Sequence, residues 1–513
     1  MAARMFAAID VGSYELNLKI YEFQSGNMKV IDSVVYRLDL GTDSYTKGKI
    51  PADKVTELIR ILKEFAGIMR SYRVSDYKAY GTSAIRETSN TRILLDQIEQ
   101  RTNIHIDVLS NSEQRFLNYK SVASKGGDFL KIIDNGTAII DIGGGSIQLS
   151  LFDNDKLDMT QNVDIGVIRL LDRLKRIDVK PSRYGEMLDE MINSQLSVLN
   201  RLYLKNRKIT NLIILDDYLS PIIWNRTRES DTPGYITASR FASFSEKLRQ
   251  MEPGEFARTY SVPLENVELV LVAAALMRNI FNVTGAEQMW SPGATLTDGI
   301  AYEYGEKKKL ITINHNFEED IVACARGISR RYMGDDKRAS NMEAICLAIY
   351  DSIKSIHGLN KRDRLILRLA AILHDCGKYI SLHNLSDCSY DIIMSTEIIG
   401  LSHEEREILA GVVKHNHAFL EFDEDKSGIN IYSDESYMRT AKLTAILRLA
   451  NGLDKSQKQK VTNIKASLKG PVLTLTVRTN KDLTLEKGLF SKRADFFEEI
   501  YNVRPVINQI AKV

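Results

Sequence analysis

The strongest constraint on the fold is a strand-and-turn pattern that occurs twice, around Asp10 and around Asp141. The apolar run Phe6 to Asp10 is followed by Gly12, and alternating apolar positions resume from Leu16 to Phe23. Thr137 to Ser150 repeats this order with a glycine-rich turn after Asp141. The two aspartates lie about 130 residues apart, so we expect two similar lobes that face each other across a cleft.

The rest of the chain alternates between helical and strand-like patterns. Helical spacing predicts helices over 53–72, 92–100 and 112–120, and apolar alternation predicts strands over 77–81 and 104–109. Beyond Leu310 helical periods dominate to about Asn451, and a strand over 472–477 and a helix over 494–501 are expected in the tail. We therefore predict a first lobe (1–128), a second lobe (129–305), a helical domain (306–460) and a C-terminal α+β cap (461–513), because 513 residues exceed one hydrophobic core.

The bulk composition limits which binding partners and which cellular compartment we expect for this chain. A net charge of +2 gives no long-range field favouring nucleic acid or an anionic membrane, so we expect neither partner. The start lacks the apolar region of a signal peptide, and the longest uncharged apolar stretch, Leu269 to Met277, is about half the ~18–20 residues needed to cross a bilayer. The cysteines show no CxxC spacing, which favours free thiols and a cytoplasmic location.

The repeated turn has a clear chemical use. A strand that ends in Asp before a glycine-rich turn presents backbone N–H groups to an anion where no side chain blocks its approach. The Asp can hold Mg²⁺ and so link the protein to phosphate oxygens. One such turn is usually structural, but two copies at the separation of a lobe favour a phosphate-binding cleft.

Several strings resemble a known family, in the expected order and spacing. They are AAIDVGS at 7–13, YGTSAIRET at 80–88, LSNSEQ at 109–114, IIDIGGGSIQLS at 139–150 and SPGATLTDGIAYE at 291–303, and they resemble the exopolyphosphatase and guanosine pentaphosphate phosphatase (Ppx/GppA) family. LRLAAILHDCGKYIS at 367–381, LAGVVKHNH at 409–417 and LRLANGLDKS at 447–456 resemble the helical HD-type domain of its long members. The resemblance covers nearly the whole chain.

The resemblance implies an α/β fold with two duplicated lobes of the actin-like ATPase (ribonuclease H-like) type, followed by a mostly helical HD-like domain and a small α+β cap. It implies removal of the terminal phosphate from inorganic polyphosphate or pppGpp with Mg²⁺, and a homodimer. The implied site has a first phosphate loop of Asp10, Gly12 and Ser13, and a second phosphate loop of Gly143, Gly144, Gly145 and Ser146. It also has Asp141 as the metal residue and Arg86 as a phosphate-binding arginine.

The chain departs from the family pattern where a base is expected. The family carries two adjacent glutamates, the second thought to activate the attacking water, and the matching positions here are Glu113 and Gln114. Gln can orient water but cannot take its proton, and losing a general base typically costs ~10² to 10⁴ in rate. Gln148 also replaces a family glutamate, while Glu15 and the run Leu215 to Tyr218 differ from the family's small-residue turns. Glu15 and Glu113 are candidates to supply the missing carboxylate.

The helical domain holds an incomplete metal-binding motif. His374 and Asp375 have the local form of an HD pair, but the places of the other two ligands hold Asn341 and Asn451, neither a strong ligand. We therefore expect a non-catalytic HD fold. His415 and His417 would share a metal only if their helix ends there.

Two hypotheses remain open. The first is a Mg²⁺-dependent phosphatase acting on inorganic polyphosphate or a guanosine polyphosphate, with Glu113, Gln114 and Asp141 as catalytic residues and Gln114 and Gln148 weakening the activity. The second is a non-hydrolytic sensor of the same ligands. An actin-like ATPase or sugar kinase is less favoured, because Leu212 to Tyr218 lacks a glycine-rich adenosine turn. Long polyphosphate would need a basic channel, and the candidates are Lys125, Lys131, Arg326, Arg330, Arg331, Lys337 and Arg338.

Overall fold

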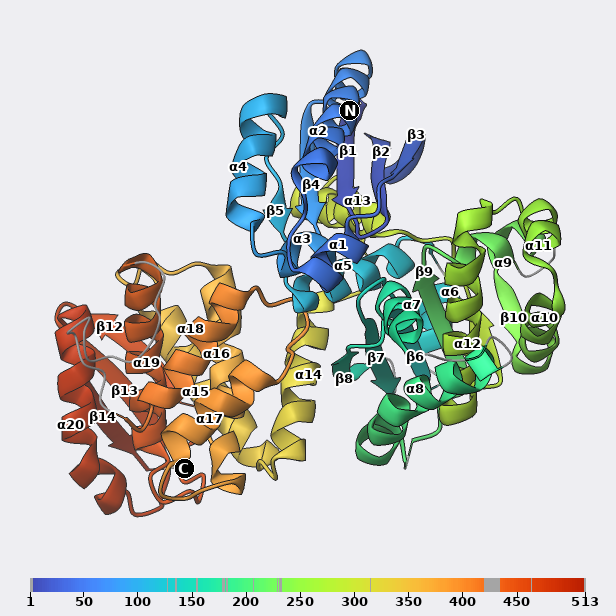
Figure 1. Ribbon diagram of the computed structural model, residues 1–513. Helices are drawn as coiled ribbons and strands as arrows, with labels where there is room; N and C mark the ends of the chain where they lie inside the picture. The colour runs from blue at the N-terminus through green and yellow to red at the C-terminus, as the bar shows by residue number, and fades with distance from the viewer. Residues whose placement is uncertain are drawn as a thin grey trace. The chain divides into compact units, whose positions relative to one another are not determined.

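The computed structural model describes residues 3–511, except 127, 134–135, 154–155, 178–179, 181–182, 206, 228, 230–232, 314, 419–433 and 463. The chain divides into two compact units, Met1–Asn316 and Phe317–Val513 (Figure 1). The change of character expected beyond Leu310 thus lies close to the boundary between the units.

The first unit contains two sheets that share one topology over five strands, and the second sheet has one further strand at its edge. The first sheet has the order β3-β2-β1-β4-β5, with β1 (Arg4–Val11), β2 (Glu15–Gln24), β3 (Asn27–Arg37), β4 (Asp76–Gly81) and β5 (Asp107–Val108). The second has the order β10-β11-β9-β6-β7-β8, with β6 (Thr137–Ile142), β7 (Ile147–Asp153), β8 (Lys156–Val163), β9 (Asn211–Asp216), β10 (Tyr235–Thr237) and β11 (Gln288–Trp290). In both sheets an antiparallel three-stranded meander continues into two parallel strands, and β10 adds an antiparallel edge to the second sheet. The internal repeat seen in the sequence is therefore a repeat of structure.

Helices cover both faces of the first sheet because its central strand β1 is apolar and buried on both faces from Phe6 to Ile9. Along β1, Ala7, Ile9 and Val11 face a core formed with α2 (Ala52–Ser71) and α4 (Thr91–Thr102). Phe6 and Ala8 point the other way, toward α13 (Leu296–Lys307) and α5 (Asn111–Ala123). The sequence-based boundary places α13 in the second lobe, whereas its side chains pack on the sheet of the first.

The second lobe has one large core, built around α12 (Val267–Thr284). The segment Leu264–Thr284 is long and apolar enough to cross a membrane, yet in this structure it packs against α7 (Val167–Arg176), α8 (Tyr184–Leu199) and α10 (Ala238–Gln250). Most of this segment is buried, as expected for the central helix of a core. The remaining elements of the unit are α1 (Gly41–Lys47), α3 (Ser83–Glu87), α6 (Asp128–Ile133), η2 (Asn200–Leu204), α9 (Ser220–Thr227), α11 (Pro253–Tyr260) and η3 (Leu264–Asn266).

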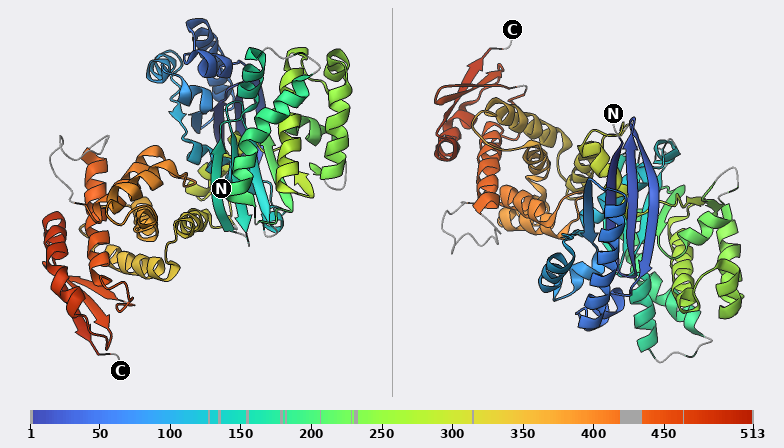
Figure 2. Two further views of the ribbon diagram at one scale, coloured as in Figure 1. Left: turned by 60° about the horizontal axis from the view of Figure 1, so that its bottom comes forward. Right: turned by 90° about the horizontal axis from the view of Figure 1, so that it is seen from above.

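The second unit is a helical domain followed by a small sheet. Its helices are α14 (Phe317–Arg331), α15 (Asp336–Ser352), α16 (Lys361–Leu373), η4 (Cys376–Tyr379), α17 (Leu385–Ser395), α18 (His403–His415) and α19 (Asp434–Leu453). The sheet has the order β12-β13-β14, with β12 (Lys465–Lys469), β13 (Val472–Arg478) and β14 (Arg504–Ile510). α20 (Thr484–Tyr501) connects β13 to the parallel β14, and these red elements lie side by side in both views of Figure 2. All four cysteines are free.

Candidate functional site

The two Asp-x-Gly turns have the same hydrogen-bond geometry. Just after Asp10, which is the last residue but one of β1, the Gly12 N–H donates to the Glu15 carbonyl at 2.9 Å. After Asp141 in β6, the Gly143 N–H donates to the Ser146 carbonyl at 3.0 Å. A Cβ on Gly12 would lie 2.7 Å from the Glu15 oxygen, so the first turn requires glycine.

The tips of the two turns lie against each other. A Cβ on Gly144 would come within 3.4 Å of the Ser13 Cβ, and a Cβ on Gly145 would come within 3.0 Å of the Tyr45 ring. The Ser13 hydroxyl is 2.6 Å from the Tyr45 hydroxyl and 2.9 Å from the Ser83 hydroxyl. The structure therefore brings the predicted phosphate loops of both lobes together, with Tyr45 between them.

Carboxylates gather at the base of these turns. Burial, together with the charges of Asp141 and Glu15, raises the pKa of Asp10 to about 7. Burial also raises the pKa of Asp141 to about 6, although a hydrogen bond from Asn118 and the charge of Arg115 oppose this shift. The Asp10 Oδ1 atom is buried and has no hydrogen-bond partner in the part of the chain that the structure describes. A positive ligand between these carboxylates would relieve their repulsion.

Helix α5 supplies the polar groups beside Asp141. Asn118 Nδ2 donates to Asp141 Oδ2 at 2.5 Å, and the Arg115 charge acts on the same carboxylate. Gln114 lies one turn before Asn118 on the same helix face. Its Oε1 atom accepts from Arg86 Nη1 at 3.5 Å, and the same Arg86 atom donates to the Leu109 carbonyl at 2.7 Å. Gln114 and Arg86 thus lie together at the start of α5.

Glu113 is engaged in a structural role at this helix start. Its Oε2 atom accepts from the Ser110 N–H at 3.0 Å, and its own N–H donates to the Ser110 hydroxyl at 3.2 Å. This reciprocal pair is a capping box, which satisfies two backbone donors of the first turn. A carboxylate used in this way is a poor candidate for a general base.

Gln148 lies next to Asp141 in the second sheet. The two residues are direct partners across the antiparallel β6–β7 pair, so their side chains share a face. Gln148 is buried, and its Oε1 atom has no hydrogen-bond partner among the residues that are described. The second neutral substitution therefore lies beside the predicted metal aspartate.

A third turn, after β9, adds two further aspartates. Asp216 accepts hydrogen bonds from the Tyr218 N–H at 2.8 Å and from the Ser220 N–H at 3.0 Å, and so holds the start of α9. Desolvation and the charges of Glu15 and Asp10 raise the pKa of Asp217. The Tyr218 ring lies 6.3 Å from the ring of Tyr14 in the first turn. The run Leu215 to Tyr218, which differs from the family's small-residue turn, therefore adds acidic charge close to Asp10 and Glu15.

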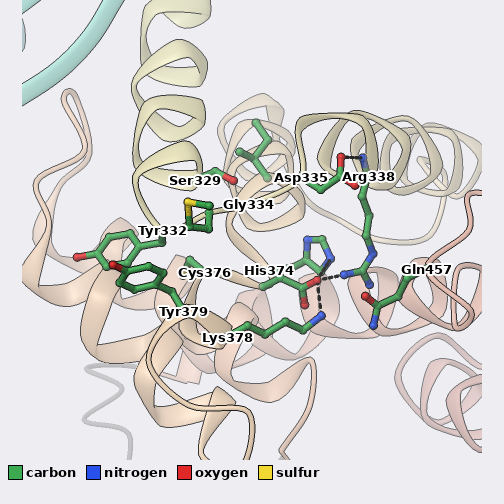
Figure 3. A pocket seen from close by; sticks show the side chains of 13 residues that line it. Ser329, Tyr332, Gly334, Asp335, Arg338, His374, Cys376, Lys378, Tyr379 and Gln457 are labelled. Atoms are coloured by element: carbon green, nitrogen blue, oxygen red, sulfur yellow. Dashed lines mark hydrogen bonds and ion pairs between the residues drawn. The ribbon is translucent and has the colours of Figure 1, made fainter. Parts of the chain in front are cut away.

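The second unit has a pocket of about 300 Å³ at its predicted HD pair (Figure 3). The guanidinium of Arg338 pairs with Asp375, and it also contacts Asp454 Oδ2 and Asn451 Oδ1, each at 3.2 Å. Lys378 Nζ lies 2.7 Å from Asp375 Oδ2. The carboxylate of the HD pair is therefore already paired with two cations of the protein itself.

The one histidine among the described residues that line this pocket, His374, favours its neutral form. Burial and the charge of Arg338 hold the pKa of His374 well below its ordinary value, and its Nδ1 lies 2.7 Å from the Ala371 carbonyl. Helix α18 does end at His415, and His417 Nε2 comes to 3.8 Å from Asp375 Oδ1. Nowhere in the described ranges, however, do three side chains of the metal-binding kinds gather in a ligand set.

Three of the predicted channel residues are already engaged in ion pairs. Lys125 pairs with Asp298 at 3.1 Å, Arg326 pairs with Glu343 at 2.5 Å, and Arg338 has the contacts given above. The side chain of Lys131 lies outside the described residues. The basic channel stays a prediction.

Sequence reasoning overlooked four side chains at or beside the turns: Arg115, Asn118, Tyr45 and Arg169, whose guanidinium carbon lies 5.1 Å from the centroid of the Tyr45 ring. Asn118 follows Gln114 by one helical turn, so helical spacing from LSNSEQ was a usable signal for it. Tyr45 and Arg169 lie in segments without a recognisable motif, and only the packing of the two lobes brings them to the turns.

The fold and this site define a class of protein: a two-lobed α/β domain in which each lobe contributes one Asp-x-Gly turn to a shared site. An exopolyphosphatase from Cytophaga hutchinsonii has the same fold, with a TM-score of 0.53 and 20% identity, covering 60% of this chain and all of that one. The fold of these structures is the actin-like two-lobe type.

Residues 19–308 match the Ppx/GppA phosphatase family, and residues 322–494 match Ppx/GppA phosphatase, domain III. The chain belongs to the Ppx/GppA phosphatase family.

Two of the chain's relatives carry different names. The chain is 27% identical to exopolyphosphatase 1 of Mycobacterium leprae over 190 residues, which is 37% of this chain and 55% of that protein. It is 19% identical to a guanosine-5'-triphosphate,3'-diphosphate pyrophosphatase of Vibrio vulnificus over 491 residues, 92% of each chain. The first of these matches thus spans about half of its relative, and the second spans nearly all.

Proposed function

We propose that the first unit hydrolyses the terminal phosphate of inorganic polyphosphate or of pppGpp in the presence of Mg²⁺. The observation that carries the proposal is the contact between the two Asp-x-Gly turns, with the half-buried Asp10 and Asp141 at their base. Relatives named for polyphosphate and for guanosine polyphosphate support this substrate class.

The residues of the turns suit phosphate oxygens. Backbone N–H groups around Gly12 and Ser13, and from Gly143 to Ser146, would donate to the phosphate without interference from Cβ atoms. Arg86 would add a charge-assisted hydrogen bond through its planar guanidinium. These contacts bind and orient the terminal phosphate between the lobes.

Asp10 and Asp141 fit a divalent cation. Each is a carboxylate whose pKa is raised by burial, and Asp10 keeps an oxygen without a partner among the described residues. Mg²⁺ is usually held by one or two carboxylates together with water and substrate phosphates, so a complete protein cage is not needed. When bound, the metal supplies positive charge that offsets the charge of both the carboxylates and the phosphate.

The proposed reaction lacks the usual general base that would take the proton of the attacking water. Gln114 lies beside Arg86 and one turn from Asn118, where its amide would orient a water but not take its proton. Phosphoryl transfer depends mainly on positioning and electrostatics, so hydrolysis without a strong base is slow rather than impossible. We also propose that the second unit is a non-catalytic, HD-like helical domain, because Arg338 and Lys378 already neutralise Asp375.

The test is phosphate release from medium-chain polyphosphate and from pppGpp with Mg²⁺. Wild type is compared with Asp141→Asn and Gln114→Glu, and with Asp164→Asn, an exposed aspartate of the same lobe, as the matched control. We expect release by wild type and by Asp164→Asn, none by Asp141→Asn, and a rise of at least tenfold in Gln114→Glu.

No release by wild type, with activity appearing in Gln114→Glu, would instead establish a non-hydrolytic sensor of the same ligands. The neutral Gln114 and Gln148 are the observation that keeps this second function in view. Release by Asp141→Asn equal to wild type would remove the interlobe site from the proposal altogether.

A further inference from the structure

Arg169 of α7 is anchored directly to the second glycine turn. Its backbone N–H donates to the Gly144 carbonyl at 3.1 Å, and the Val167 N–H donates to the Gly143 carbonyl at 3.0 Å. A Cβ on Gly166, the residue before α7, would lie 2.3 Å from the Gly144 backbone. The first turn of α7 therefore moves with the loop that is proposed to bind phosphate.

The side chain of Arg169 crosses from the second lobe to the first. Its Nη2 atom lies 2.7 Å from Glu87 Oε2, and its Cζ atom lies 5.1 Å from the centroid of the Tyr45 ring. Glu87 is the last residue of α3 and directly follows Arg86 in the chain. The hydroxyl of Tyr45 is hydrogen-bonded to Ser13 of the first turn. The guanidinium thus lies against Tyr45, which contacts the first turn, while the backbone of Arg169 is bonded to the second turn.

The ion pair between Arg169 and Glu87 is weakly held. The side chains are 22% and 38% exposed, and pairs open to water contribute little because solvent screens them. The Nε atom of Arg169 is buried and has no hydrogen-bond partner in the described part of the chain. A phosphate would accept from this donor and from Nη2 together, in the two-bond geometry that arginine favours.

The negative charge of the carboxylates at the turns would be offset by the guanidinium of Arg169. Asp10, Glu15, Asp141 and Asp217 act on one another electrostatically and oppose the approach of a phosphate. We propose that Arg169 is a phosphate-binding residue of the interlobe site, and that Glu87 holds its guanidinium until a phosphate oxygen displaces the carboxylate. This inference rests on the proposed function, because it takes phosphate as the ligand.

The experiment is a binding titration of the full chain with medium-chain inorganic polyphosphate and Mg²⁺, at low and at physiological salt. Arg169→Gln removes the guanidinium, Glu87→Gln removes the competing carboxylate, and Arg169→Lys keeps the charge but loses the planar fork. Arg173→Gln is the matched control, because Arg173 is an exposed arginine one turn later on α7. Circular dichroism and the melting temperature check that each variant folds.

We expect the Kd to rise at least tenfold in Arg169→Gln, to rise less in Arg169→Lys, and to stay unchanged in Arg173→Gln. Glu87→Gln is expected to lower the Kd several-fold, with a smaller gain at higher salt because the competing ion pair is screened. The opposite signs at Glu87 and Arg169 are the distinguishing result. A pair that only joined the lobes would weaken binding equally from either side.

Equal losses in Arg169→Gln and Glu87→Gln would overturn the inference and leave a structural contact. Wild-type affinity in a folded Arg169→Gln variant would overturn it as well, while leaving the proposed function in place. No binding of polyphosphate by wild type would count against the proposed function first, and against this inference with it.

Discussion

Asp298 is a buried carboxylate whose removal should destabilise the first unit by a calculable amount. It is 1% exposed and lies at the start of α13, where its Oδ2 atom accepts from the Thr295 N–H at 3.0 Å. Lys19 of β2 lies 3.2 Å from its Oδ1, and Lys125 lies 3.1 Å from its Oδ2. The hydroxyl of Tyr21 donates to Oδ1 at 2.8 Å. Asp298→Asn would leave both lysines without their charge partner.

The magnitude follows from the pKa. Burial opposes ionisation of Asp298, but Lys19 and Lys125 outweigh it and lower its pKa from 3.8 to about 2. At 1.36 kcal/mol per unit, this shift corresponds to about 2 kcal/mol of stability in the ionised state. Because the folded pKa lies below the unfolded one, this stability is fully present above about pH 4 and is lost as the pH falls toward 2.

The assay is urea unfolding followed by tryptophan fluorescence. Trp224 and Trp290 are the tryptophans of the chain and both lie in the first unit, so the signal reports on that unit. We expect Asp298→Asn to be less stable by about 2 kcal/mol at pH 7, with the difference narrowing below pH 4. Asp76→Asn is the control, since Asp76 pairs with Arg4 at 3.8 Å and is 40% exposed. A constant difference between pH 7 and pH 3 would refute the reasoning.

Three further variants test other parts of the structure. Arg338→Met should cost about 3–5 kcal/mol, because it leaves the fully buried Asp454 without its cation; an unshifted calorimetric transition of the second unit would contradict this. Gly166→Ala should destabilise the first unit by more than about 1 kcal/mol, because its Cβ would overlap the Gly144 backbone, whereas Gly185→Ala on α8 meets only the end of Arg249 and should be near neutral in urea unfolding. Glu113→Gln keeps an acceptor for the capping box, so stability and phosphate release should stay near wild type; a loss of ~10² in rate would assign the base to Glu113 after all.

Features encoded by neighbouring residues could be predicted from the sequence. The strands before Asp10 and Asp141 follow from apolar runs of β-forming residues, and the turns follow from glycines that the backbone geometry requires. The duplication of the two lobes could be predicted because the same local strand-and-turn pattern occurs at Asp10 and at Asp141. The start of α5 was also encoded locally, but Ser110 and Glu113 form a capping box, so the glutamate interpreted as catalytic is used by the helix.

Features that depend on contacts between distant segments could not be predicted. Arg169 meets Glu87 across 82 positions, and Arg338 meets Asp454 across 116. No spacing rule links such pairs, because only the packing of lobes and helices decides which side chains meet. α13 belongs by sequence to the second lobe, yet its apolar face completes the core of the first.

The distribution of carboxylates indicates where a replacement base would lie. Gln114 and Gln148 remove negative charge beside Arg86 and Asp141, whereas Glu15 and Asp217 add it at the first and third turns. Burial raises the pKa of Glu15 as well, but its ion pair with Arg37 at 3.4 Å opposes this shift. Desolvation and the charges of Glu15 and Asp10 raise the pKa of Asp217, as a general base requires, and no arginine opposes this shift among its main causes. If wild type releases phosphate, Asp217→Asn should therefore reduce the rate more than Glu15→Gln does, and the reverse order would place the base in the first turn.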